Sequence, residues 1–307
     1  MSKKEKIVSI NYVKHNFETI GLILCLYILL VLYIPLVLTA YFESVPGFSL
    51  VINNDYLYIG IIYLLFVIGS LVPTLLLFSS TKVRFEDVWR KCNITFKDLA
   101  VNTIVFIALG TATMFLTMVI NSYLPLGEKI VSPVGLPFEQ RYLLNPLYGF
   151  LFIIVSPIVE EFAFRGVLLR SLGRYGNLFA IWTIALFYAL SHASFAEMIP
   201  SFVMSVFLTK MTLRYRSIQP SIVIHIIFNA ILYAFAITPL NYYWVVATIL
   251  FALYFLTIVF IFTKTYRYVH IGKTVHDRTI WQLFLSRPSI ICALSLVILH
   301  SLFMAIF

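Results

Sequence analysis

The sequence has few charged residues and few cysteines, and both shortages narrow the class of protein. Only 11% of its 307 residues are charged, whereas 61% are hydrophobic and the mean hydropathy is +0.97. This composition excludes a soluble globular domain and indicates a polytopic membrane protein. The three cysteines are far apart and form neither a disulfide framework nor a paired-cysteine metal motif: Cys25, Cys92 and Cys292.

Several catalytic signatures are also missing. The sequence has no HExxH zinc motif, no GxSxG nucleophile elbow and no cysteine next to a histidine. Its four aspartates all fall outside the long apolar runs and are Asp55, Asp87, Asp98 and Asp277. A pair of catalytic aspartates within the membrane is therefore excluded.

Nine apolar runs predict an all-α membrane bundle of about eight or nine transmembrane helices. The first run begins near Ile20 and has no small-residue cleavage site, so we expect a retained span and not a removed signal peptide. The segment 79–98 fits either an amphipathic helix on the inner membrane surface or a solvated loop. The runs cover about residues 19–42, 56–78, 99–120, 146–170, 178–194, 197–213, 219–237, 243–264 and 289–307.

The basic residues predict the orientation of this bundle. With the N-terminus inside, 20 of the 22 lysines and arginines fall on the inner side, and only Lys129 and Arg141 fall on the outer side. Cytoplasmic loops of membrane proteins carry such an excess. We therefore expect a cytoplasmic N-terminus and an outer C-terminus. The same distribution explains the net charge of +9 without a nucleic-acid partner.

Two adjacent carboxylates interrupt the fourth apolar run. Glu160 and Glu161 lie near its middle, where a charged side chain costs roughly 2.5–3.5 kcal/mol. Glu161 and Arg165 are four residues apart and can pair on one helix face, whereas Glu160 points about 100° away. Pro157, one turn upstream, is expected to interrupt the backbone bonding and bend the helix. The pattern fits either a structural ion-pair network or a functional site.

Two of the six histidines lie in apolar runs beside polar neighbours at helical spacing. His192 follows Tyr188 by four residues, and His225 precedes Asn229 by four, so each pair shares a helix face. A carboxylate with an imidazole can activate water for attack on a carbonyl, and an imidazole with a carboxamide can stabilise the resulting oxyanion. The same glutamate and histidine side chains could instead bind zinc.

Taken in order, these residues resemble the motifs of a known membrane protein family. Three segments resemble motifs of the CPBP family, which contains CAAX prenyl endopeptidases and bacteriocin-processing (Abi) proteins. They are Glu160-Glu161-x-x-x-Arg165, Tyr188-x-x-x-His192 and His225-x-x-x-Asn229. The resemblance covers roughly residues 100–237. It departs from the family at Tyr188, where a phenylalanine is usual; the ring is kept.

The resemblance implies an intramembrane endopeptidase that cleaves a membrane-anchored or apolar peptide near the inner surface of a bacterial cell membrane. It implies Glu160 and His192 as the water-activating pair and His225 with Asn229 on the oxyanion side. Glu161, Arg165 and Tyr188 would be supporting residues. No cofactor is favoured, because the motifs offer one unpaired carboxylate and an oxyanion pair but no supporting pattern for zinc. If zinc is used, its ligands would be Glu160, His192 and His225.

This interpretation divides the chain into three parts and leaves two other functions open. We expect N-terminal transmembrane helices and an inner loop in residues 1–98, a catalytic core in 99–237 and C-terminal transmembrane helices in 238–307. One of the two other functions is a catalytically silent membrane scaffold on the same fold, against which the intact Glu160, His192, His225 and Asn229 argue. A transporter would also bury charged residues, although the sequence has no internal repeat or matched pair of broken helices.

Overall fold

In the computed structural model, the described part of the chain is entirely helical, as the apolar runs predict. The described residues are 3–48, 51, 53–81, 83–123, 144–192, 195–238, 242–263 and 278–306. The first half contains α1 (Lys3–Ile28), η1 (Leu29–Tyr33), α2 (Ile34–Ser44), η2 (Pro46–Phe48), α4 (Asp55–Ser80), α5 (Phe85–Val88) and α6 (Phe96–Tyr123). The second half contains α8 (Pro146–Phe150), η3 (Leu151–Val155), α9 (Ser156–Glu160), η4 (Glu161–Leu168), α10 (Leu169–Gly173), α11 (Asn177–Leu190), α12 (Phe195–Tyr215), α13 (Gln219–Ile237), α14 (Tyr243–Phe262), α15 (Arg278–Leu285) and α16 (Pro288–Ile306).

Five helical segments of the described chain are long and apolar enough to cross a membrane. A sixth is obtained if α15 and α16, which are bent by 71° relative to each other, count as one span. The predicted count of eight or nine is therefore not confirmed, although every predicted run contains a helix. Lys129 and Arg141 lie outside the described residues, and the orientation stays a prediction. The five spans are Ile10–Phe42, Asp55–Ser80, Phe96–Ile120, Pro146–Gly173 and Gln219–Ile237.

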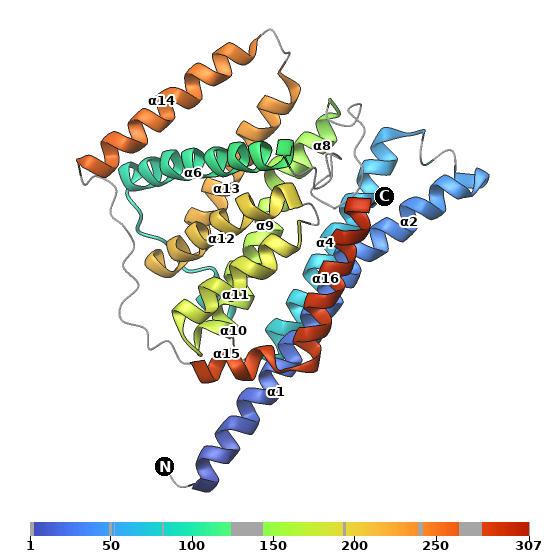
Figure 1. Cartoon of the computed structure of the whole chain (residues 1–307), viewed down its shortest axis with the longest axis vertical. Helices are drawn as coiled ribbons and strands as arrows, with labels where there is room; N and C mark the ends of the chain where they lie inside the picture. Colours follow the sequence, from blue (N-terminus) through green and yellow to red (C-terminus); the bar gives the residue numbers. More distant parts are fainter. Residues whose placement is uncertain are drawn as a thin grey trace.

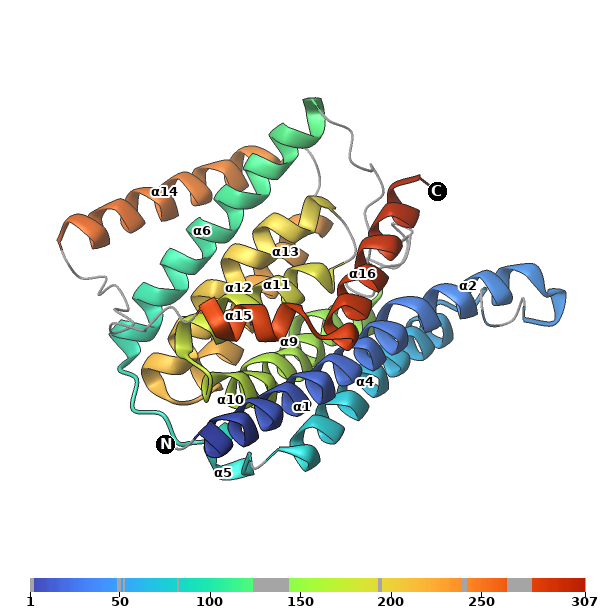
Figure 2. The ribbon, with the colours of Figure 1, turned by 60° about the horizontal axis from the view of Figure 1, so that its bottom comes forward.

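One long helix through the middle of the bundle organises the packing (Figure 1). This central helix runs from Pro146 to Gly173 and consists of α8, η3, α9, η4 and α10. On one side it contacts α4, which packs with α1, and α16 covers α1 in turn. On the other side it contacts α11, α12 and α13, followed outwards by α6 and α14 (Figure 2). Side chains near the midpoint of the central helix therefore lie between a group formed by α1, α4 and α16 and a group formed by α6 and α11 to α14.

Local sequence signals fix both ends of the central helix. At its start, the Asn145 side chain accepts a hydrogen bond from the backbone N–H of Leu147, and Pro146 takes the first helical position. At its end, Gly173 closes α10 and Gly176 adopts a φ of 128°, a conformation that glycine allows without a Cβ penalty. The chain reverses there into α11. The central helix and α11 are thus neighbours, as α10 and α11 pack together.

The central helix is not a regular α-helix. Two stretches have π-type backbone bonding, η3 immediately before Pro157 and η4 from Glu161 onwards. Proline at position 157 has no N–H and so cannot continue the regular bonding pattern. The predicted interruption at Pro157 therefore takes the form of a π-helical stretch. Such stretches occur often at functional sites, because they re-aim side chains relative to a regular helix.

The short helix α15 lies where the sequence suggested only an inner loop. Its apolar residues recur at helical spacing, and Phe284 is buried at 1% exposure. The Phe284 ring packs edge-on against Phe17 of α1 at 5.2 Å and against Phe179 of α11 at 5.3 Å between centroids. Helix α15 therefore packs across the middle of α1 and the start of α11 before the chain bends into α16.

Candidate active site

The two adjacent carboxylates of the central helix are both buried. Glu160 is 9% exposed at the end of α9, and Glu161 is fully buried at the first position of η4. Charged side chains almost never lie this deep without partners. The neighbouring helices provide different partners for the two side chains.

Glu161 is held by a cation and an imidazole. Its Oε1 accepts a hydrogen bond from Nη1 of Arg165 at 2.9 Å and lies 3.1 Å from Nδ1 of His225 on α13. Arg165 is also fully buried, so water does not screen this ion pair. The pairing expected from the spacing of Glu161 and Arg165 is therefore present, and it also fixes the His225 ring.

Glu160 faces α11 and the opposite edge of the same imidazole. Its Oε2 accepts a hydrogen bond from the Tyr188 hydroxyl at 2.7 Å. The same oxygen lies 4.0 Å from Nε2 of His225, which is longer than a direct hydrogen bond. His225 therefore lies between the two carboxylates, bonded to Glu161 and separated from Glu160 by a gap.

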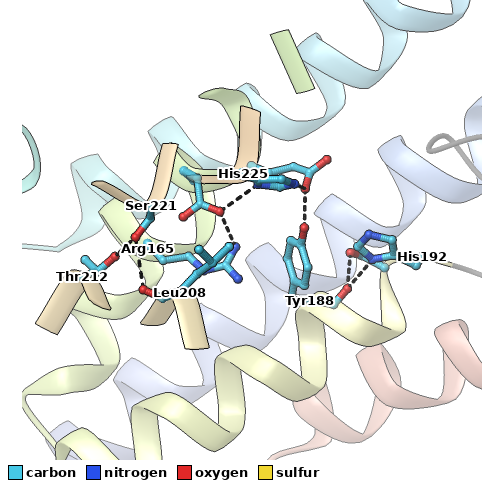
Figure 3. Close-up of polar contacts among 10 residues, drawn as sticks. Arg165, Tyr188, His192, Leu208, Thr212, Ser221 and His225 are labelled. Carbon is cyan, nitrogen blue, oxygen red and sulfur yellow. Dashed lines mark hydrogen bonds and ion pairs between the residues drawn. The ribbon is translucent and has the colours of Figure 1, made fainter. Parts of the chain in front are cut away.

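Tyr188 connects the remaining charged and polar groups. Figure 3 shows its ring between Arg165 and His192. The guanidinium carbon of Arg165 lies 4.3 Å from the ring centroid, and the His192 ring packs edge-on at 4.8 Å between centroids. Nδ1 of His192 bonds to the backbone carbonyl of Tyr188 at 2.8 Å. His192 is half-buried at the turn after α11, so it lies at the more accessible side of the cluster.

Asn229 projects from α13 toward the central helix. Its Nδ2 donates a hydrogen bond to the carbonyl of Phe152 in η3 at 3.0 Å, and the side chain is 7% exposed. A carboxamide carries two N–H groups, so this bond leaves one further donor. The carbonyl of Phe152 was not evident from the sequence, because backbone acceptors freed by π-type bonding have no residue signature.

The expected residues come together in part. Five of them form one cluster connected by hydrogen bonds and close charge contacts: Glu160, Glu161, Arg165, Tyr188 and His225. Within the described residues no hydrogen bond joins Glu160 to His192, although the two are close enough for the charge of Glu160 to act on the imidazole. The pairing of Glu160 with His192 therefore stays a prediction, and His225 at 4.0 Å is a second imidazole beside the same carboxylate. Asn229 is bonded to the central helix and not to His225.

Two tyrosines from the first half of the chain were missed by the sequence motifs. Tyr27 of α1 and Tyr63 of α4 are buried and close enough to Glu160 to interact with its charge. Tyr27 also packs edge-on against Phe164 at 5.6 Å between centroids, and Phe164 packs against Tyr188 at 5.2 Å. Their aromatic character alone gave no signal, since tyrosine and phenylalanine are frequent throughout this chain.

The arrangement does not form a zinc ligand set. A tetrahedral zinc site needs three or four side-chain ligands converging at about 2.0–2.3 Å. Within the part of the chain that the structure describes, no group of three His, Cys, Asp or Glu side chains is placed to hold a metal ion. We therefore assign the chemistry to the protein's own side chains. The histidine contacts themselves do not exclude a metal, because Nδ1 of His225 and of His192 bond to Glu161 and to a carbonyl, as in metal-ligating histidines, and leave Nε2 free.

Comparison with known proteins supports the resemblance seen in the motifs. Residues 142–231 match the family model described as type II CAAX prenyl endopeptidase Rce1-like. No curated protein and no solved structure matches the chain significantly. The matched segment covers less than a third of the chain but contains the whole cluster from Glu160 to Asn229. It confirms the resemblance to CAAX endopeptidases and supports proteolytic activity in general, and the apolar helices support an integral membrane protein.

Proposed function

We propose that the protein is an intramembrane endopeptidase in which Glu160 and His225 activate a water molecule for attack on a peptide bond. The observation that carries the proposal is the 4.0 Å separation between Oε2 of Glu160 and Nε2 of His225, both buried. Two hydrogen bonds through one water span such a distance. The assignment gives Glu160 the role of general base.

The protonation of His225 follows from its partner. Nδ1 faces the Oε1 atom that also accepts from Arg165, so Nδ1 carries the ring proton and donates it to Glu161. Nε2 of the neutral ring is then an acceptor, as is the Glu160 carboxylate. Two acceptors facing each other need a donor between them. A water donating one hydrogen to each would present its oxygen lone pairs to a substrate carbonyl.

His192 and Asn229 are assigned to the other charges that develop during hydrolysis. Nδ1 of His192 faces a carbonyl oxygen, which only accepts, so this nitrogen carries the proton and Nε2 is the basic atom. In its protonated form, the accessible His192 can deliver a proton to the leaving amine. The second N–H of the Asn229 carboxamide is the oxyanion donor in this proposal.

The substrate class follows from where the cluster lies. Glu160 is near the middle of a helix of membrane-spanning length, so a soluble peptide would have to leave water to reach it. A peptide carried by a lipid anchor or an apolar segment enters at less cost. We therefore propose a membrane-anchored peptide or protein, cleaved from the cytoplasmic side of a bacterial cell membrane. A prenylated CAAX-type peptide and a bacteriocin precursor are the two substrates to test first.

The test uses the purified full-length protein in detergent with a library of prenylated and unmodified peptides. We expect cleavage by the wild-type protein and a loss of about 10²–10⁴-fold in Glu160→Gln, the usual range for removal of a general base. Glu18→Gln is the matched control. Its oxygen still accepts the hydrogen bond from the N–H of Ser289, so rate and stability should stay unchanged. Full activity in Glu160→Gln would refute the enzyme assignment.

A further inference from the structure

A second polar region lies at the end of the central helix, away from the candidate active site. Four arginines and one aspartate, together with Val83, line a cavity of about 250 Å³: Arg90, Arg170, Arg174, Arg216 and Asp87. At about 30 Å³ per water molecule, this volume holds roughly eight waters, which is enough for a phosphate group with its hydration. Figure 2 shows that α5 and α10 lie near the start of α1, at the end predicted to face the cytoplasm.

Among the described residues that line the cavity, one carboxylate faces four arginines and does not neutralise them. Asp87 is already shared, because Oδ2 lies 3.2 Å from Nε of Arg84 and Oδ1 lies 3.9 Å from Nη2 of Arg90. Like charges held this close raise the energy of the folded state unless an anion neutralises them. The cavity therefore has an excess of positive charge that its own residues leave uncompensated.

The hydrogen bonds of Arg170 indicate which class of ligand the cavity binds. Its Nη2 donates to the backbone carbonyl of Arg216 at 3.3 Å, whereas its Nε is buried with no hydrogen-bond partner in the described part of the chain. Because Nε has no accessible surface, an anion in the cavity meets the other N–H groups of the Arg170 guanidinium and not Nε. The guanidinium fork is suited to planar, multi-oxygen anions. A phosphomonoester provides several acceptor oxygens and about two negative charges, which suits this excess better than a single carboxylate.

Backbone and core contacts hold the cavity walls together. The loop containing Asp87 and Arg90 is fixed by Val88, which is fully buried, and the Ser217 hydroxyl donates to the carbonyl of Arg90 at 2.6 Å. A Cβ at Gly166 would lie 2.8 Å from Val88, so the loop rests directly on η4. The cavity is thus built from three segments that meet only in the folded chain.

We propose that this arginine-lined cavity is a binding site for a phosphomonoester, either the headgroup of an anionic lipid or a soluble phosphate. The bound anion neutralises Arg170, Arg174 and Arg216 and links the inner loop to the central helix and to the turn before α13. The site is separate from the candidate active site and does not depend on the proposed proteolysis. One of its walls, the loop of Asp87 and Arg90, rests through Val88 on η4, which carries Glu161 and Arg165.

The experiment measures binding to the full-length protein in two arms. The first titrates inorganic phosphate into protein in a neutral detergent. The second compares nanodiscs of phosphatidylcholine alone with nanodiscs that also contain phosphatidic acid, whose headgroup is a phosphomonoester. The variants are Arg170→Gln with Arg174→Gln, and separately Arg216→Gly, which the φ of 52° at this residue allows without strain. Lys91→Gln removes an exposed charge from the same loop without lining the cavity and is the control.

We expect saturable binding in at least one arm and a Kd that is about 10–100-fold weaker in the cavity variants, with Lys91→Gln close to wild type. Saturation by inorganic phosphate identifies a soluble ligand, and binding only in the phosphatidic acid nanodiscs identifies a lipid. Arg216→Gly keeps the test valid if the double variant does not fold. Absence of binding in both arms, or an equal loss in Lys91→Gln, would overturn the proposal.

Discussion

Replacement of Glu161 by glutamine tests why the central helix carries two carboxylates side by side. Glu161 and Arg165 are both fully buried, and their 2.9 Å contact is the only ion pair of that arginine in the described chain. Glutamine has the same shape but no charge, so the guanidinium would stay buried without a counter-ion. Breaking a buried pair in this way costs about 3–5 kcal/mol.

The corresponding change in melting temperature is large enough to measure. Domains of 150–250 residues lose roughly 2–4 °C per kcal/mol, and longer chains lose less. At about 2.1 cal/mol/K per residue, a chain of 307 residues loses about 1.6 °C per kcal/mol, so we expect Glu161→Gln to melt about 5–8 °C below the wild-type protein. Glu160→Gln should change the melting temperature by less than about 2 °C, because the glutamine oxygen still accepts from Tyr188 and no buried cation loses its partner.

A double variant separates stability from activity. Glu161→Leu with Arg165→Met removes both charges, and replacing a buried pair by apolar residues of similar volume is often neutral or stabilising. The double variant should therefore recover most of the lost melting temperature. It should stay inactive, because Nδ1 of His225 loses the acceptor that holds the ring against Glu160.

The assays are thermal unfolding in detergent followed by intrinsic fluorescence, and peptide cleavage on the same samples. A melting temperature of Glu161→Gln within about 2 °C of wild type would show that the buried ion pair does not contribute the expected stability. The reasoning is equally refuted if the double variant melts no higher than the single one, because the cost would then not come from an unpaired buried charge.

Three further predictions concern the oxyanion donor, the metal and the orientation. Asn229→Ala should slow cleavage by about 10²–10³-fold with unchanged substrate binding, measured as kcat against KM. A chelator such as 1,10-phenanthroline should leave the rate unchanged, whereas loss that zinc restores would contradict the metal-free mechanism. In a cysteine-free background, a membrane-impermeant thiol probe should label Val134→Cys, which lies outside the described residues, and not Ile94→Cys; the reverse result would invert the bundle.

Composition and apolar run length were sufficient to predict the helices but not the number of spans. Each predicted run contains a helix, because about 20 apolar residues in a row have few other stable arrangements in lipid. Helix α11 shows the difficulty with counting. Its 14 residues span about 21 Å at 1.5 Å per residue, which is short of the roughly 30 Å hydrocarbon core. Length in sequence therefore does not decide which helices cross the membrane.

Helical spacing predicted local pairs better than partners from other helices. The pairing of Glu161 with Arg165 follows from four residues on one helix and is present. The predicted approach of His192 to Glu160 depends on how two helices face each other; no hydrogen bond joins them within the described residues, so this pairing stays a prediction. Spacing in the sequence assigns a residue to a helix face. The packing angle between helices and the π-type turns of η4 determine which residues of other helices that face contacts.

The match to CAAX endopeptidases covers the residues to which we assign the chemistry but not all of the walls around them. Tyr27 and Tyr63 come from α1 and α4, which lie in the part expected to be only N-terminal transmembrane helices. They bring hydroxyl groups and ring surface close to Glu160 on the side opposite α13. Helix α16 packs along α1, so the C-terminal end supports the same wall from outside. The division at residues 98 and 237 stays a prediction. In the packing, α1 and α4 line one side of the carboxylate that the proposed mechanism uses as its base, and α16 lies behind α1.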